Sequence, residues 1–176
     1  QQMSMGNTEG FIQEIMNAGK TLADARKGGT SGCVEVGAFG NEAYILTGYF
    51  NIPKIFELTL NNGYDHMSGQ QLGLELGYAT DFKSYEELWD AFAKQMEYFV
   101  NIKVQGSNII ERIFAEHMPA PFLSIITNDC IARGKDYNAG GARYNTNYLQ
   151  GVGIGTITDC LAAVKYNVYD NKKTST

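Results

Sequence analysis

The chain has 176 residues, and its 14 Lys and Arg against 19 Asp and Glu give a formal net charge of −5. This acidic balance, without a basic run, excludes a nucleic-acid binder that relies on neutralising phosphates. Hydrophobic residues make up 44% of the chain and charged residues 19%, which excludes disorder over most of its length. No stretch approaches the roughly 20 apolar residues of a membrane span, and no charged-then-apolar start indicates a signal peptide.

Three widely spaced cysteines do not form a disulfide framework, so the sequence predicts a reducing, cytoplasmic location. Cys130 and Cys160 lie in helical patterns, and we expect both to be packing residues. The cysteine spacing does not resemble a structural zinc site, so no metal is expected. His66 and His117 are isolated in the sequence, which disfavours a role for either as a ligand or a base.

The first segment with helical periodicity covers residues 8–26. Its apolar positions are Phe11, Ile12, Ile15, Met16 and Leu22. A Gly-punctuated loop without periodicity follows over residues 30–40, and its glycines predict unusual φ values in a confined space. A second helix is predicted from about Asn51, with Pro53 in its first turn, to Gly63.

The longest predicted helix opens with Ser84-Tyr85-Glu86-Glu87, which is a capping box. Gly106 is predicted to interrupt it before a second helical stretch over residues 109–117. The aromatic face over residues 85–100 is predicted to be core rather than a binding site. The residues that line this face are Leu88, Phe92, Met96, Phe99 and Val100.

Prolines 119 and 121 break the helical pattern, and a further helix is predicted over residues 122–133. A Gly-rich stretch over residues 138–155 precedes a last helix over residues 156–169. Its end, Gly151-Val152-Gly153-Ile154-Gly155, lacks the spacing of a nucleotide-binding loop and predicts a tight strand-to-helix turn. The whole pattern indicates a helix-rich α/β protein whose strands are poorly resolved in the sequence.

The segment Gly32-Cys33-Val34-Glu35 is the sharpest chemical feature. Cys33 lies on no apolar stripe, and an extended backbone would place Glu35 on the same side of the chain. A neighbouring carboxylate raises the pKa of a thiol, so this pair is a poor ionic nucleophile. The pair suits a division of labour in which the sulfur moves a hydrogen atom and the carboxyl moves a proton. A buried structural cysteine is the equally weighted alternative.

Several separated segments agree in order with one known family. They are Lys27-Gly28-Gly29-Thr30-Ser31-Gly32-Cys33-Val34-Glu35, Asn51-Ile52-Pro53-Lys54, Glu57-Leu58-Thr59-Leu60-Asn61-Asn62-Gly63, Asn108-Ile109-Ile110-Glu111-Arg112, Met118-Pro119-Ala120-Pro121-Phe122-Leu123-Ser124 and Gly140-Gly141-Ala142-Arg143-Tyr144-Asn145. Through these segments the chain resembles the glycyl radical enzymes along nearly its whole length. Within that superfamily it looks most like the hydroxyproline dehydratases.

The resemblance implies a role for each matching residue. Cys33 matches the cysteine that becomes a thiyl radical and abstracts a hydrogen atom from the substrate, and Glu35 matches the general acid/base beside it. Tyr49 matches an active-site tyrosine that contacts the substrate. The implied reaction removes the 4-hydroxyl of trans-4-hydroxy-L-proline as water and yields 1-pyrroline-5-carboxylate. The implied fold is α/β, part of the ten-stranded α/β barrel of glycyl radical enzymes, with Cys33 on a central loop.

Two positions distinguish the chain from other branches of the superfamily. Val34 follows Cys33 where pyruvate formate-lyases carry a second cysteine, which argues against acyl transfer. Val36 and Gly37 stand where the glycerol and choline enzymes usually continue with proline. A glycyl radical lyase acting on a diol, glycerol or choline stays the alternative, as does a non-catalytic fragment or a split subunit.

The family stores its radical on a glycine in an Arg-Val-x-Gly-Tyr-like motif, and the chain contains no such motif. The chain also opens with Gln1 rather than Met. We therefore expect residues 1–176 to be a central, helix-rich fragment of the barrel domain, with the cysteine loop at about residues 28–40. The N-terminal half and the glycyl radical domain are expected to be absent, so we expect the fragment alone to be inactive.

The resemblance also implies partners. We expect a small-molecule substrate, and a separate S-adenosylmethionine-dependent activase with an iron–sulfur cluster that installs the glycyl radical on the missing segment. The parent enzyme is expected to form a homodimer, as the family tends to do. No bound cofactor, nucleic acid or membrane is expected to associate with the chain.

Overall fold

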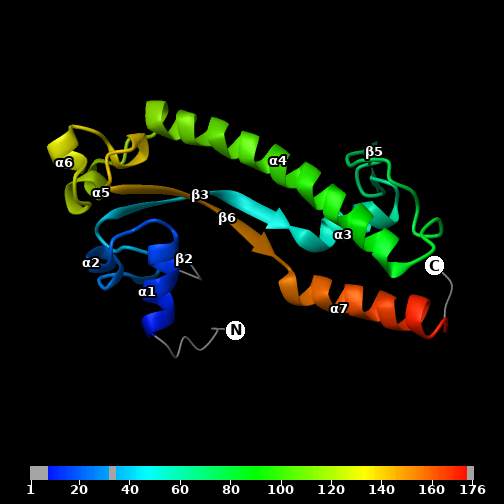
Figure 1. Ribbon diagram of the computed structural model, residues 1–176. Helices are drawn as coiled ribbons and strands as arrows, with labels where there is room; N and C mark the ends of the chain where they lie inside the picture. Colours follow the sequence, from blue (N-terminus) through cyan, green and yellow to red (C-terminus); the bar gives the residue numbers. More distant parts are fainter. Residues whose placement is uncertain (1–7, 32–34, 174–176) are drawn as a thin grey trace. The chain divides into compact units, whose positions relative to one another are not determined.

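The structure is a computed structural model that describes residues 8–31 and 35–173 (Figure 1). It divides into two compact units. The first consists of the chain up to Thr47 together with Ser107–Tyr148, and the second consists of Gly48–Gly106 together with the residues from Leu149 onward. Helix α4 (Tyr85–His117) and strands β3 (Glu42–Asn51) and β6 (Tyr144–Val152) each contribute residues to both units.

Short elements build the first unit. Its helices are α1 (Thr8–Asn17), α2 (Leu22–Ala25), α5 (Pro121–Ile126), α6 (Cys130–Arg133) and the 3-10 turn η1 (Tyr137–Ala139). Strands β1 (Gly29–Ser31) and β2 (Glu35–Gly37) form an antiparallel pair. The buried core of this unit consists of Ala43, Ile45, Cys130, Tyr137 and Ala142, with Phe114 and Ala120 packed against it.

Strands β3 and β6 pair in a two-stranded sheet, and their arrows point the same way in Figure 1. Ala43 and Ile45 of β3 are buried whereas Leu46 is exposed, which is the alternation of a strand covered on one face. Strand β6 lies inside the predicted Gly-rich stretch, and neither strand was predicted from the sequence. The β6 sequence, Tyr-Asn-Thr-Asn-Tyr-Leu-Gln-Gly-Val, has too little apolar alternation to indicate a strand.

The second unit has an apolar core formed by α3 (Ile52–Leu60), α7 (Ile154–Val164) and part of α4. Its buried residues are Ile55, Phe56, Leu88, Phe92, Ile157 and Leu161. Phe56 and Phe92 meet edge to face with ring centroids 5.5 Å apart. Strands β4 (Tyr64–Asp65) and β5 (Gln70–Gln71) and the π-helical segment η2 (Lys165–Asp170) belong to the same unit. The predicted core role of the aromatic face of α4 is confirmed for Leu88, Phe92, Met96 and Phe99, whereas Val100 is exposed.

Two local predictions in this unit are confirmed. The Asn51 side-chain oxygen accepts a hydrogen bond from the Lys54 backbone N–H at 3.2 Å and caps α3, which has Pro53 in its first turn. Gly153 has a φ of 88° and joins the end of β6 directly to α7, which is the expected strand-to-helix turn. A side chain at Gly153 would collide with the Pro53 ring.

The predicted single helix over residues 8–26 is wrong. Helix α1 ends near Gly19, whose φ of 84° is left-handed, and α2 starts anew after Thr21. The Thr21 hydroxyl accepts the Asp24 N–H at 3.2 Å and caps α2. Between the two helices Lys20 is buried, and its ammonium binds Glu42 at 2.6 Å. A long-range ion pair therefore accompanies the break.

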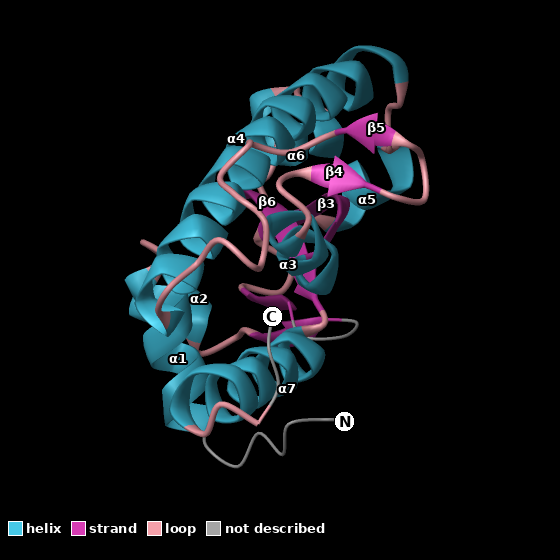
Figure 2. Cartoon of the chain, turned by 90° about the vertical axis from the view of Figure 1, so that its right-hand side faces the viewer, coloured by secondary structure: helices cyan, strands magenta, loops and turns pink. Residues whose placement is uncertain are grey.

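The predicted interruption at Gly106 is also wrong, because α4 runs unbroken from Tyr85 to His117, as Figure 2 shows. A glycine inside a helix costs only about 0.5–1 kcal/mol, which the hydrogen bonds of a long helix outweigh. The capping box at the start of α4 is confirmed for one of its contacts, since the Ser84 hydroxyl accepts the Glu87 N–H at 3.2 Å.

The predicted helix over residues 122–133 is divided into α5 and α6. Asp129 stands directly before α6 with a left-handed φ of 75°, which no continuous helix allows. Its carboxylate binds Arg143 at 3.0 Å, so the turn places a charged side chain for a long-range contact. The predicted aperiodic loop over residues 30–40 likewise contains strand β2 and the end of β1.

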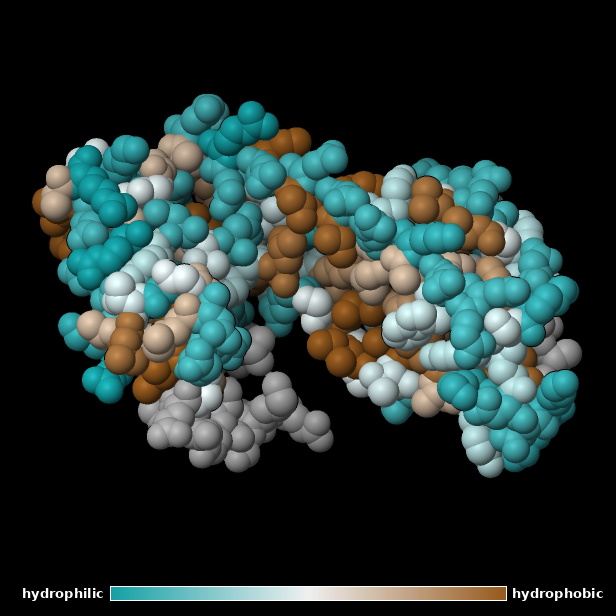
Figure 3. All heavy atoms as spheres, in the orientation of Figure 1, coloured by the Kyte–Doolittle hydropathy of each residue, from teal (hydrophilic) through white to brown (hydrophobic). Residues whose placement is uncertain are grey.

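Apolar side chains reach the surface in several places, and Figure 3 shows them on one face. The large exposed ones include Ile109 and Ile113 of α4, Phe122 and Ile125 of α5, and Ile131 of α6. Throughout the described ranges, every helix is too short or too polar to cross a bilayer.

Candidate active site

Strand β2 carries Glu35, the residue predicted to be the general acid/base. Its antiparallel pairing with β1 aligns Glu35 with Ser31 and Gly37 with Gly29, and Glu35 is half-buried. Cys33, the residue predicted to form the radical, is in the 32–34 segment outside the described residues. The structure therefore bears on the site through Glu35 and the groups that hold β2.

The most enclosed charge near β2 is the carboxylate of Glu42, which is 3% exposed. It accepts hydrogen bonds from the Lys20 ammonium at 2.6 Å, the Ala38 N–H at 2.8 Å, the Thr146 hydroxyl at 2.5 Å and the Tyr148 hydroxyl at 3.1 Å. A buried carboxylate is stable only when donors replace its lost hydration, and Glu42 has them on both oxygens. We interpret Glu42 as an anchor for β2 rather than a group that meets substrate.

Tyr148 connects this carboxylate to β2. Its ring stacks on Tyr44 with centroids 5.6 Å apart and an interplanar angle of 10°. Its hydroxyl donates to the Val36 carbonyl, which lies 3.0 Å away in the middle of β2. Burial, then the charge of Glu42 and to a smaller extent that of Glu35, raises the pKa of Tyr148. The phenol therefore keeps its proton and acts as a donor at physiological pH.

Gly37, at the end of β2, lies directly against these side chains. A Cβ added there would come closer to a Glu42 carboxylate oxygen and to the Tyr44 hydroxyl than side chains tolerate. At Gly28 an added Cβ would collide with the Gly37 carbonyl. These contacts give a physical reason for glycine at positions 28 and 37, where the chain is confined as the sequence predicted.

Replacing Gly37 with alanine is expected to destabilise the protein by about 1–3 kcal/mol, because Glu42 is held by four donors and cannot move aside. The matched control is Gly106→Ala in α4, where a Cβ has open space and is expected to stabilise by about 0.5–1 kcal/mol. Thermal unfolding of the two variants checks the prediction. Equal unfolding temperatures would show that β2 tolerates displacement.

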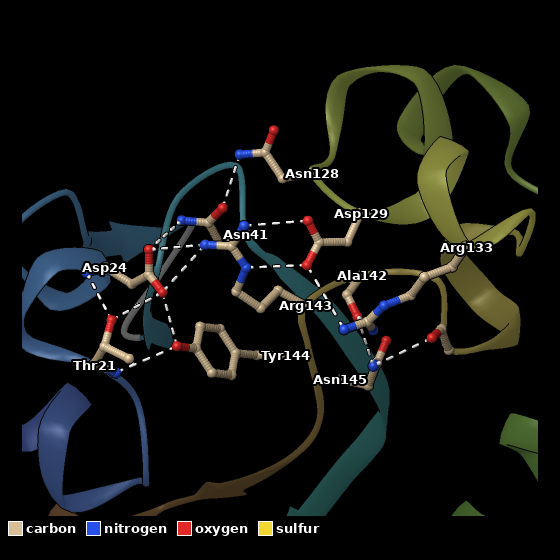
Figure 4. Close-up of polar contacts among 11 residues, drawn as sticks. Thr21, Asp24, Asn41, Asn128, Asp129, Arg133, Ala142, Arg143, Tyr144 and Asn145 are labelled. Atoms are coloured by element: carbon tan, nitrogen blue, oxygen red, sulfur yellow. Dashed lines mark hydrogen bonds and ion pairs between the residues drawn. The ribbon is translucent and has the colours of Figure 1, made fainter.

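A second network holds α2 against the segment that precedes β6 (Figure 4). Arg143 bridges Asp24 at 3.3 Å and Asp129 at 3.0 Å, and the Tyr144 hydroxyl donates to Asp24 at 2.7 Å. The Asn41 side-chain amide donates to the same carboxylate at 2.9 Å. The hydrogen bond from Tyr144 is the main cause that holds the pKa of Asp24 below its usual value. This network assigns a structural role to part of the Gly140–Asn145 segment.

Asp136 holds another segment that carries the family resemblance, Met118–Ser124. Its carboxylate accepts the Ala120 N–H at 3.0 Å and the Ser124 hydroxyl at 2.7 Å. The side-chain amide of Asn138 donates to the Met118 carbonyl at 2.7 Å. The turn between α4 and α5 is thus fixed by polar contacts rather than by apolar packing alone.

The structure places the predicted site residues in different units. Glu35 belongs to the first unit, whereas Tyr49 lies on the part of β3 in the second unit and is 65% exposed. His66 is exposed, and its ring lies 3.1 Å from the Asn61 side-chain oxygen. His117 is exposed at the end of α4 beside Glu116.

The two remaining cysteines differ. Cys130 is buried in the core of the first unit, as predicted, and burial raises the pKa of its thiol. Cys160 is exposed on α7, so the prediction that it packs is wrong. A helical pattern alone does not tell whether a given cysteine lies on the buried or the exposed face of its helix.

Sequence reasoning missed the anchor residues Lys20, Glu42, Tyr44, Thr146 and Tyr148. Lys20 stood inside a predicted helix, and Glu42 followed the Gly-rich loop without a motif of its own. Lys and Glu are rarely buried unless paired, but the burial of Lys20 and Glu42 becomes visible only in the structure. The partner of each could not be named from the sequence.

The family comparison decides the identity of the fold. The pyruvate formate lyase-like family model matches residues 1–176. The chain belongs to this family. The pyruvate formate lyase-like assignment agrees with the resemblance carried by the cysteine-loop segments.

The chain is similar to individual family members over nearly all of its own length but over only a small part of theirs. The chain is 65% identical over 95% of its length to a trans-4-hydroxy-L-proline dehydratase of Clostridioides difficile, and covers 21% of that protein. It is 36% identical over 93% of its length to a (2S)-3-sulfopropanediol dehydratase of Klebsiella oxytoca, covering 20% of it. The chain therefore spans about one fifth of the length of these relatives.

Solved structures agree. The hydroxyproline dehydratase of Clostridioides difficile, solved with trans-4-hydroxy-L-proline bound, superposes with a TM-score of 0.90 at 64% identity, over 96% of this chain and 21% of that one. A glycyl radical enzyme from Archaeoglobus fulgidus superposes with a TM-score of 0.79 at 32% identity, over 92% of this chain and 21% of that one. The helix-rich fold of this chain is thus a portion of the glycyl radical enzyme fold.

Proposed function

We propose that the chain is part of a glycyl radical dehydratase that converts trans-4-hydroxy-L-proline to 1-pyrroline-5-carboxylate and water. The observation that carries the proposal is its 65% identity to the hydroxyproline enzyme over 95% of the chain, against 36% to the sulfopropanediol enzyme. The half-buried Glu35 on an anchored strand adds a positioned carboxyl beside Cys33 in sequence.

In this proposal Cys33 moves a hydrogen atom and Glu35 moves a proton. The Cys33 thiyl takes the hydrogen from the ring carbon next to nitrogen, which forms an S–H bond and leaves a carbon radical. Glu35 protonates the adjacent hydroxyl, which leaves as water, and regains a proton from the substrate radical. Return of the hydrogen atom from Cys33 completes the product and restores the thiyl. A glycyl radical on a segment outside these residues would supply the unpaired electron.

The same proposal implies how the full-length protein is built and activated. The chain would supply the cysteine loop and part of a ten-stranded barrel, with Tyr49 contacting the substrate in the assembled site. A radical S-adenosylmethionine activase would install the radical, and the parent would act in the cytoplasm as a homodimer. A closed, water-free interior would protect the radical.

The full-length protein that contains this chain, activated anaerobically, is expected to convert trans-4-hydroxy-L-proline to a product trapped with ortho-aminobenzaldehyde. Glycerol, propane-1,2-diol and choline are expected to react at least about 10²-fold more slowly, because a site built for one set of polar groups rejects others. Turnover of one of these in place of hydroxyproline would assign the alternative reaction.

The intact mass of the same protein is expected to exceed 19.4 kDa several-fold, because the relatives are about five times as long as this chain. The isolated 176 residues are expected to give no product, because the proposed radical-bearing segment lies outside them. A mass near 19.4 kDa would require a second polypeptide that carries the radical.

A further inference from the structure

The strand that carries Glu35 is attached to its unit by hydrogen bonds on both sides of Gly37. The Tyr148 hydroxyl donates to the Val36 carbonyl at 3.0 Å, and the Ala38 N–H donates to Glu42 at 2.8 Å. Of these two contacts, the one from Tyr148 lies closer to the proposed acid/base, because Val36 adjoins Glu35 in the chain. Loss of this contact would leave β2 attached next to Glu35 only through its pairing with β1.

Tyr148 is itself firmly placed. Its ring stacks on Tyr44, and its hydroxyl lies 3.1 Å from the Glu42 oxygen that also binds Lys20 and Thr146. A phenol has a single proton, which the Val36 carbonyl and the Glu42 carboxylate share as acceptors. These contacts hold the Tyr148 oxygen at a defined point next to the Val36 carbonyl. Strand β2 is thus held by a hydrogen bond from a hydroxyl whose own position is fixed.

We infer that Tyr148 is a positioning residue for Glu35, holding β2 so that the carboxyl reaches the departing hydroxyl of the substrate. This inference rests on the proposed dehydratase function. Proton transfer needs heavy atoms about 2.6–3.2 Å apart, and a displacement of about 1 Å can lower turnover on the order of 10²-fold. Tyr148 acts through the Val36 backbone and does not itself meet the substrate.

Electrostatics agree with this placement. The negative charge of Glu35 is among the causes that raise the pKa of Tyr148, so the two side chains lie within electrostatic reach. Tyr148 belongs to β6, more than a hundred positions from Glu35, and the contact is therefore a product of the fold.

The test uses Tyr148→Phe in the full-length, anaerobically activated enzyme. Phenylalanine keeps the ring that stacks on Tyr44 and removes only the hydroxyl. The expected result is a fall in kcat of roughly fivefold to twentyfold, the effect of one hydrogen bond on a positioned group, with KM changed less than about twofold. The glycyl radical signal in electron paramagnetic resonance is expected to be unchanged.

The matched control is Tyr144→Phe on the same strand. Tyr144 also loses a hydroxyl, but that hydroxyl donates to Asp24 and accepts from the Thr21 N–H, and it does not contact β2. The kcat of this variant is expected to equal that of the parent enzyme. Equal kcat values for Tyr148→Phe and Tyr144→Phe would overturn the inference.

A double-mutant cycle with Glu35→Gln separates positioning from general stability. If Tyr148 acts through Glu35, adding Tyr148→Phe to Glu35→Gln is expected to change the residual kcat less than about twofold. A further fivefold to twentyfold fall in that background would overturn the inference. If the unsubstituted full-length enzyme does not dehydrate hydroxyproline, the proposed function itself is wrong. That result differs from failure of the inference, in which the unsubstituted enzyme is active and the Tyr148 variant is equally active.

Discussion

Replacing Cys33 with serine is expected to lower product formation by the activated full-length enzyme to below about one thousandth of the parent rate. An O–H bond is much stronger than an S–H bond, so the glycyl radical cannot take the hydrogen atom from a serine hydroxyl, and no radical forms at this position to attack the substrate. The glycyl radical itself does not need Cys33. Its electron paramagnetic resonance signal is therefore expected to persist at parent intensity while turnover is lost.

Cys160→Ser is the matched control for this experiment. It makes the same thiol-to-hydroxyl change at an exposed position of α7, and full turnover is expected. Product formation by the Cys33 variant at a rate comparable to this control would remove Cys33 from the mechanism. The proposed radical route would then have to begin at another residue.

Glu35→Gln is expected to reduce kcat by about 10²–10⁴-fold, the range that general acid/base catalysis contributes. Glutamine has the size of glutamate but cannot protonate the departing hydroxyl, so KM is expected to change much less than kcat. Steady-state kinetics on trans-4-hydroxy-L-proline measures both constants.

Glu116→Gln provides the comparison, because this carboxylate is 70% exposed at the end of α4. Its kinetics are expected to match those of the parent enzyme. Normal turnover by the Glu35 variant would make that carboxyl a structural residue, and the proton donor would have to be sought elsewhere in the parent enzyme.

Local signals predicted some elements well. Helix α3 begins with a side-chain cap at Asn51 and a proline in its first turn, and both act within a few residues of the chain. The turn at Gly153 was predictable for the same reason. Helix α4 was recognised from its capping box and apolar face, although its continuity through Gly106 was not.

Long-range contacts explain the errors. The break between α1 and α2 accompanies the pairing of Lys20 with Glu42, and the left-handed turn at Asp129 accompanies its contact with Arg143. Strand β6 is built mainly from polar and aromatic residues, several of which bond polar groups distant in the sequence, so hydrophobic periodicity cannot reveal it. Each of these features depends on residues distant in the sequence.

The candidate site divides in the same way. Cys33 and Glu35 were predicted because residue chemistry and family resemblance agree on one short segment. The groups that hold β2 come from α1–α2, β3 and β6, and no short motif joins them. Tyr49 stays a prediction from resemblance, since it belongs to the other unit.

The attachment of β2 to β6 has a consequence for biosynthesis. Thr146 and Tyr148 follow Glu42 by 104 and 106 positions, so at about 5–20 residues per second their synthesis trails by about 5–20 s. During that interval Glu42 has the Lys20 ammonium and the Ala38 N–H as donors but lacks the hydroxyls of Thr146 and Tyr148. The full set of contacts that holds β2 is thus completed late, and a nascent chain stopped before Thr146 would carry this strand without the hydrogen bond to the Val36 carbonyl.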